Sequence, residues 1–106
     1  MQTAELVSFI QDKIDDMKGR DIVTLDVRGK SSVTEFMIVC SGTSNRHTKS
    51  IADYVAGEAK KAGLPTLGIE GQASGEWVLL DLDDVVVHVM LEETRSFYQL
   101  EKLWSA

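Results

Sequence analysis

The sequence that decides the fold reads FMIVCSGTSNRH over residues 36–47, where an uninterrupted apolar run passes into small polar residues. The apolar run, residues 36–40, has no polar alternation, which is typical of a strand covered on both faces inside an α/β sheet. Gly42 permits a tight turn after this strand, and Thr43 or Ser44 can cap a helix that begins there. The stretch therefore predicts a buried strand, a turn and the start of a helix.

The predicted helix runs from about residue 44 to residue 62, and Gly63 and Pro65 end it. Its apolar residues recur at spacings of three and four, so one face is apolar. Three potential cations project from its first turns, where the positive end of the helix also attracts anions. Most clusters of this kind are solvated helix surface, and the alternative is a secondary contact with an anionic partner. The three residues are Arg46, His47 and Lys49.

The segments on either side predict an α/β domain with a mixed sheet. An apolar stripe in residues 6–17 predicts a first helix, with Gly19 at its C-terminal cap. The order helix, strand, strand, helix, three strands and helix predicts a mixed five-stranded sheet with helices packed on it, in one domain of residues 1–106. The other predicted segments are strands at 22–27, 35–41, 66–69, 77–82 and 85–90 and one or two short helices within 92–104.

Composition restricts the classes of function. The 106 residues are 43% apolar, which is enough for one core, and the formal net charge is -6. An acidic surface repels phosphate at long range, so a basic protein is a better partner for it than free nucleic acid. One cysteine and two histidines are too few for a structural zinc site, and we expect no cofactor. The chain lacks a basic N-terminal leader and a membrane-length apolar segment, so we expect a cytoplasmic protein that contacts no membrane.

Three separated motifs resemble the ribosomal silencing factor family, whose members are also called Iojap-like proteins. The first motif is residues 41–53, the second pairs Glu70-Gly71 with Trp77, and the third runs from residues 84–89 to residues 95–104. The motifs occur in the family's order and spacing, and the resemblance covers nearly the whole chain.

Two departures from the family pattern are visible. Asp83 stands in a turn where the family favours glycine, and residues 91–93 lack a proline that is often found before the last helix. Aspartate tolerates left-handed backbone better than most residues do, so the departure at Asp83 affects only local turn geometry.

The resemblance implies both a function and a fold. A silencing factor binds the large ribosomal subunit through ribosomal protein L-fourteen, sterically blocks joining with the small subunit and so represses translation when nutrients are limiting. The family acts by binding and not by catalysis, and its fold is similar to that of nucleotidyltransferases. A free homodimer that uses the same surface is an open alternative, and contact with ribosomal RNA is secondary at most.

Aromatic residues are the main candidates for the partner-binding site, because tryptophan and tyrosine are enriched at interface hot spots. Trp77 has core packing as its alternative role. Tyr98 lies off a predicted buried stripe formed by Phe97, Leu100 and Trp104, which favours its exposure. The resemblance favours an interface role for both Trp77 and Tyr98.

His88 lies in an apolar strand, on the same face as Val86 and Met90. Either a hydrogen bond inside the protein satisfies its ring, or the ring opens onto a surface, and the sequence leaves both readings open. The full set of predicted partner-binding residues is Trp77, Tyr98, His88, Leu80, Met90, Arg46 and His47.

Two other classes of function remain as alternatives. A nucleotidyltransferase-like enzyme would hold triphosphate at residues 42–44 and magnesium at Asp81 and Asp83, but aspartates are common in hairpin turns because they form local hydrogen bonds. Cys40 ends an apolar strand, so a small buried hydrophobe is favoured over a nucleophile. A direct RNA binder would use the cations of the long helix. We therefore expect a binding protein that is not an enzyme.

Overall fold

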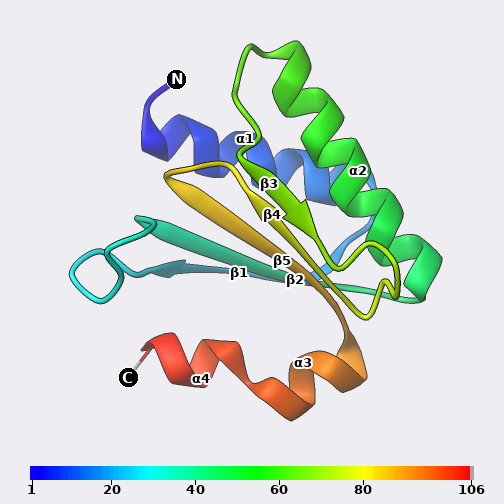
Figure 1. Ribbon diagram of the computed structural model, residues 1–106. Coiled ribbons are helices and arrows are strands. Elements are labelled where there is room, and N and C mark those ends of the chain that lie inside the picture. The colour runs from blue at the N-terminus through cyan, green and yellow to red at the C-terminus, as the bar shows by residue number, and fades with distance from the viewer. Residues whose placement is uncertain (106) are drawn as a thin grey trace.

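The computed structural model describes residues 1–105 and contains one five-stranded sheet with helices on both of its faces (Figure 1). In chain order the elements are α1 (Thr3–Asp16), β1 (Arg20–Asp26), β2 (Phe36–Gly42), α2 (Asn45–Lys61), β3 (Gly68–Glu70), β4 (Trp77–Asp81), β5 (Val85–Leu91), α3 (Glu92–Tyr98) and α4 (Leu100–Ser105). The strand order is β1-β2-β5-β4-β3; β2 and β5 are parallel, and the other neighbouring pairs are antiparallel. The predicted mixed sheet is confirmed. No helix within residues 1–105 has the length and apolar character that a membrane crossing requires.

The junction between β2 and α2 forms as the sequence predicts. Met37 to Cys40 are buried, in agreement with a strand covered on both faces. The Ser44 hydroxyl caps α2 by accepting a hydrogen bond from the backbone N–H of His47 at 3.1 Å. A Cβ atom at Gly42 would lie 2.6 Å from a methyl carbon of Thr48, so glycine lets the helix start close against the strand.

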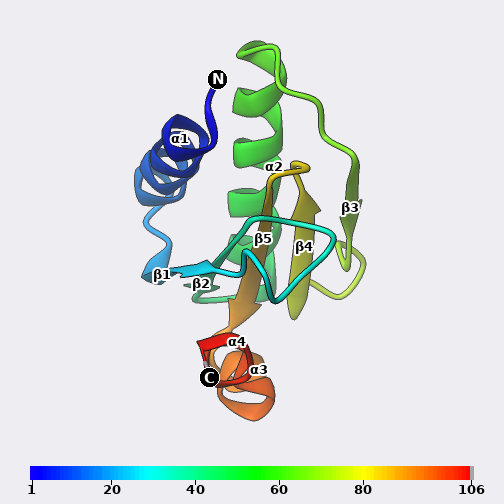
Figure 2. The same ribbon diagram turned by 90° about the vertical axis from the view of Figure 1, so that its left-hand side faces the viewer.

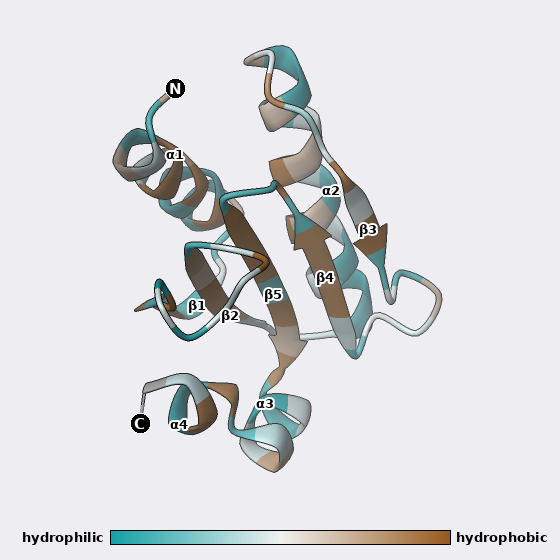
Figure 3. Cartoon of the chain, turned by 60° about the vertical axis from the view of Figure 1, so that its left-hand side comes forward, coloured by the Kyte–Doolittle hydropathy of each residue, from teal (hydrophilic) through white to brown (hydrophobic). Residues whose placement is uncertain are grey.

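Helices α1 and α2 cover one face of the sheet and bury the larger of two core clusters there (Figure 1). Side chains of a strand alternate between faces, so every second residue of the central strands points to this cluster. Figure 3 shows β4 and β5 as largely apolar strands. The buried members of the cluster are Leu6, Ile10, Ile14, Ile38, Cys40, Ile51, Ala52, Val55, Ala59, Val78, Leu80, Leu82, Val85, Val87 and Val89.

Helices α3 and α4 lie on the other side of the sheet from α1 and α2, near one end of the strands (Figures 1 and 2). The core cluster on this side is smaller. Leu100 and Trp104 of α4 pack into it, whereas α3 contributes no buried residue. The buried members of this cluster are Val27, Met37, Val39, Met90 and Leu100.

The short helices predicted within residues 92–104 are present as α3 and α4, but the predicted buried stripe is only partly correct. Gln99 has left-handed backbone angles, φ 50° and ψ 52°, and this break separates α3 from α4. Helical spacing does not continue across the break, so the predicted buried stripe holds only for Leu100 and Trp104. The assignment of Phe97 to that stripe is wrong, because its side chain is 80% exposed. Tyr98 is 53% exposed, and its predicted exposure is confirmed.

Two turns depend on residues with left-handed backbone. Helix α1 ends at Asp16, and Lys18, with φ 59°, rather than the predicted cap residue Gly19, adopts the left-handed conformation that is common after a helix. Gly19 has a different role, because a Cβ atom there would collide with the side chain of Ile14. Asp83 has φ 72°, so aspartate accommodates the turn between β4 and β5.

Candidate functional site

Three aromatic side chains form a continuous surface where β4 meets α3. The ring of Tyr98 packs between the other two, with its centroid 4.9 Å from that of Trp77 and 5.0 Å from that of Phe97. Trp77 is partly buried, whereas Phe97 and Tyr98 are 80% and 53% exposed. We call these three residues the aromatic surface. A contiguous group of exposed aromatic rings is typical of protein-binding sites.

A hydrogen bond to the buried His88 fixes the indole of Trp77. The Trp77 Nε1–H donates a hydrogen bond of 2.9 Å to Nδ1 of His88, so the proton of the neutral imidazole is on Nε2. The His88 side chain is 6% exposed, and this burial lowers its pKa to about 4. Of the two readings that the sequence leaves open, the hydrogen-bonded one is correct. His88 supports the aromatic surface and is not itself part of the exposed area.

Leu80 and Met90 are completely enclosed by the protein. Leu80 points into the α1–α2 side of the sheet, away from Trp77, and Met90 lies in the small cluster beneath α4. Neither side chain offers surface to a partner in this structure. We therefore leave both out of the proposed contact area.

The three potential cations at the start of α2 differ in their contacts and exposure. The backbone N–H of Thr43 donates to Nδ1 of His47 at 2.9 Å, and Nε2 of the same ring lies 2.8 Å from the backbone carbonyl oxygen of Met17. Through these two contacts the His47 ring ties the start of α2 to the residue that follows α1. Arg46 is exposed, whereas Lys49 is partly buried. The structure therefore places His47 in the scaffold and leaves Arg46 as the exposed cation of the group.

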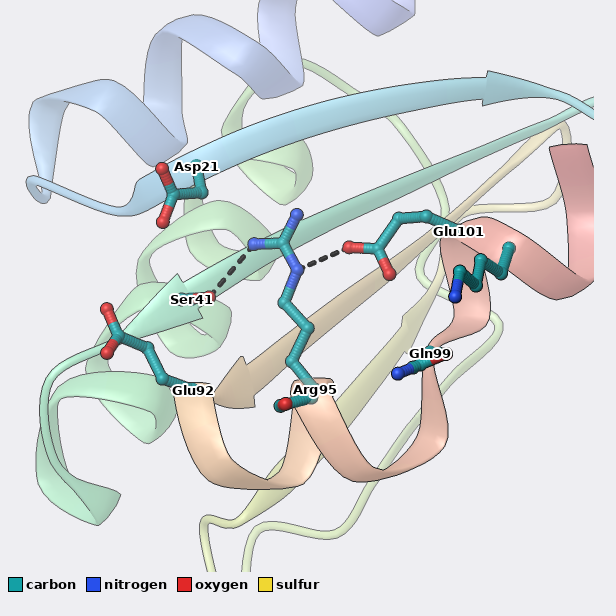
Figure 4. Close-up of a pocket in the computed structure, with 8 residues that line it drawn as sticks. Asp21, Ser41, Glu92, Arg95, Gln99 and Glu101 are labelled. Carbon is teal, nitrogen blue, oxygen red and sulfur yellow. Dashed lines mark hydrogen bonds and ion pairs between the residues drawn. The ribbon is translucent and has the colours of Figure 1, made fainter.

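Arg95 anchors α3 to the rest of the molecule (Figure 4). Its Nη1 donates a 2.9 Å hydrogen bond to the hydroxyl of Ser41 at the end of β2, and its Nε donates to a carboxylate oxygen of Glu101 on α4. The Arg95 side chain is only 12% exposed. Because α3 buries no residue of its own, this arginine fixes the helix that carries Phe97 and Tyr98.

Sequence reasoning missed two residues of this site. Helical spacing predicts a core position for Phe97, because the left-handed break at Gln99 leaves no clear signal in the sequence. Arg95 lies within the third family motif, but its anchoring role depends on contacts with Ser41 and Glu101 that the sequence does not reveal.

The residues considered for an enzyme site do not have the geometry that such a site needs. The Asp81 carboxylate accepts a 2.9 Å hydrogen bond from the backbone N–H of Asp83, which is the local turn role that the sequence favours. No group of three or more metal-ligating side chains converges within residues 1–105. Cys40 is fully buried, and this burial raises the pKa of its thiol to about 12, so it has the character of a core residue.

Comparison with known proteins identifies the family. The family model described as "Ribosomal silencing factor during starvation" matches residues 1–106. A relative from Haemophilus influenzae, named "Ribosomal silencing factor RsfS", is 49% identical over 100 residues, which cover 94% of this chain and 98% of the relative. A crystal structure of a protein from Chromobacterium violaceum superposes with a TM-score of 0.97 at 43% identity and covers 100% of this chain and 88% of that one.

A more distant relative is the mouse protein named "Mitochondrial assembly of ribosomal large subunit protein 1". It is 34% identical over 103 residues, which cover 94% of this chain and 43% of the mouse protein. The resemblance seen in the sequence is thus confirmed over its full length, together with the prediction of a silencing factor and not an enzyme. This chain belongs to the ribosomal silencing factor family.

Proposed function

We propose that this protein binds the large ribosomal subunit through ribosomal protein L-fourteen and thereby prevents the small subunit from joining. The observation that carries the proposal is the aromatic surface, formed by Trp77, Tyr98 and Phe97 on a member of the silencing factor family. We place the activity in the cytoplasm, and its consequence is repression of translation under nutrient limitation.

The chemistry of this surface suits a protein partner. Tyr98 and Phe97 present large rigid rings, and such rings supply most of the binding energy at the centre of many protein interfaces. The net charge of -6 favours a basic ribosomal protein over exposed phosphate, and it accelerates the encounter at low salt. The rings then determine how long the complex lasts, because affinity differences lie mostly in dissociation rates.

The inhibitory step is steric exclusion. The folded chain measures 34 × 32 × 21 Å, and a rigid body of this size on the face of one subunit occupies space that the other subunit needs. No catalytic group is required, so the degree of inhibition follows the occupancy of the large subunit.

A subunit-joining assay tests the proposal. Purified large and small ribosomal subunits are mixed with the wild-type protein, and joined ribosomes are measured by sucrose-gradient sedimentation. We expect joining to fall as the protein saturates the large subunit and to recover with Tyr98→Ala, while Asp12→Asn on the far side of the sheet inhibits like the wild type. Wild-type protein that leaves joining unchanged at saturation would contradict the proposal.

The aromatic surface also offers a contact for a second copy of the chain when the ribosome is absent. A free homodimer of this kind would compete with docking, because both states would cover Tyr98. Light scattering over a range of concentrations detects the dimer, and the Tyr98→Ala variant is expected to stay monomeric.

A further inference from the structure

We infer that the hollow beside the aromatic surface receives an arginine side chain from the partner protein, an inference that rests on the proposed function. The hollow lies between the start of β4 and α3. Two of its six lining residues are acidic and two are aromatic, so one small site combines negative charge with flat apolar walls. The lining residues are Glu76, Leu91, Glu93, Thr94, Phe97 and Tyr98.

The walls of the hollow are fixed before a partner arrives. The backbone N–H of Leu91 donates a 3.0 Å hydrogen bond to the carbonyl oxygen of Glu76, which holds the two sides of the hollow together. The Tyr98 ring packs against Trp77, and Trp77 is hydrogen-bonded to His88. A site that is already ordered loses little conformational entropy on binding, so more of the contact energy appears as affinity.

The two carboxylates are available to an incoming cation. Glu76 and Glu93 are exposed, and within residues 1–105 neither forms an ion pair. By contrast, Glu101 is paired with Arg95, and Glu58 lies 3.0 Å from Lys61. A cation that enters the hollow therefore neutralises negative charge without breaking an existing pair.

Arginine matches both parts of the hollow. Its planar guanidinium stacks on aromatic rings such as Phe97 and donates in a fork to carboxylates such as Glu93. Lysine satisfies the carboxylates but has no plane to stack. A phosphate group is repelled by the two carboxylates, and an apolar side chain would desolvate them without compensation.

Binding to purified large ribosomal subunits, measured over a range of potassium chloride concentrations, tests the inference. The variants are Glu76→Gln, Glu93→Gln and the double variant, with Asp12→Asn on α1 as the control that removes one negative charge elsewhere. We expect about a tenfold loss of affinity for the double variant and a shallower salt dependence, because desolvated charge pairs contribute strongly to affinity. The control should stay within about twofold, since Asp12 lies on the far side of the sheet, and an exposed charge outside the contact area contributes little.

The variant Phe97→Leu tests the contact between the incoming cation and the aromatic wall of the hollow. Leucine keeps apolar bulk but removes the aromatic face, so stacked arginine predicts about a threefold loss of affinity, the size of a modest cation–π contact. Unchanged affinity for Phe97→Leu overturns the assignment of arginine. Unchanged affinity and salt dependence for the double glutamine variant overturn the hollow as a cation site, but they leave the proposed function to the separate test of subunit joining. Failure of the wild type to bind large subunits removes the proposed function itself.

Discussion

The two faces of the sheet are built differently. Helices α1 and α2, of 14 and 17 residues, close a large apolar core on one face. The other face carries α3 and α4, of 7 and 6 residues, over a small cluster, and two aromatic rings beside it stay exposed. The first face therefore supplies most of the buried core, and the second face presents the binding surface on short helices.

The short helices depend on the sheet for their position. Helices of six or seven residues are not stable alone in water, and α3 has no buried side chain to hold it. Arg95 and the packing of Leu100 and Trp104 supply the attachment. The second face is therefore the region where small changes should alter binding before they alter global stability.

Truncation of Leu80 should give the largest effect on stability. The side chain is fully buried on the α1–α2 face, and Leu80→Ala removes it and leaves a cavity. We expect a loss of about 3 to 4 kcal/mol in the free energy of unfolding, measured by urea denaturation. Phe97→Ala on the opposite face should change the same quantity by less than about 0.5 kcal/mol. Equal costs at the two positions would contradict the division between the faces.

Acid should weaken the second face through His88. Burial holds the pKa of His88 at about 4, against about 6.5 in the unfolded chain, so between these values the unfolded chain binds a proton that the folded chain does not. Stability should therefore fall as the pH drops from 6.5 to 4, by at most about 3 kcal/mol. Urea titrations at several pH values measure this fall in the free energy of unfolding. The His88→Gln variant should lack the part of the fall that comes from His88. The same pH dependence in both proteins would disprove the role of His88.

Loss of Arg95 should loosen α3 and α4 while the first face stays intact. Arg95→Ala removes the bonds to Ser41 and Glu101 and leaves a partly buried carboxylate without its cation. We expect a loss of about 2 kcal/mol in stability, the size of a hydrogen bond to a charged group. Hydrogen exchange should accelerate in residues 92–104 and not in α2. Uniform acceleration over the whole chain would show that the two faces are not separable.

The smallest effect is expected at Lys30. Its Nζ donates a 2.9 Å hydrogen bond to the backbone carbonyl oxygen of Trp104, but the contact is exposed. Lys30→Ala should lower the free energy of unfolding by less than about 0.5 kcal/mol in thermal denaturation. A loss above 1 kcal/mol would mean that this one surface bond, rather than Arg95, holds α4.

Sequence reasoning succeeded where a pattern is local and failed where it depends on a break. The run of residues 36–40 predicted the buried strand because apolar continuity is a property of the chain itself. The periodicity of residues 97–104 gives a wrong prediction for Phe97 because Gln99 interrupts the helix. Glutamine is not a usual left-handed residue, so the sequence does not indicate this break. The bond between Trp77 and His88 joins two strands, so their separate positions in the sequence left its existence open.

Photo-crosslinking from position 98 tests the central claim most directly. Tyr98 is replaced by the photoreactive benzoylphenylalanine, which keeps an aromatic ring, and the protein is irradiated on purified large ribosomal subunits; the same replacement at Asp12 on α1 is the control. We expect a crosslink from position 98 to ribosomal protein L-fourteen and none from position 12. Crosslinks from position 12 alone, or from position 98 only to ribosomal RNA, would contradict the account.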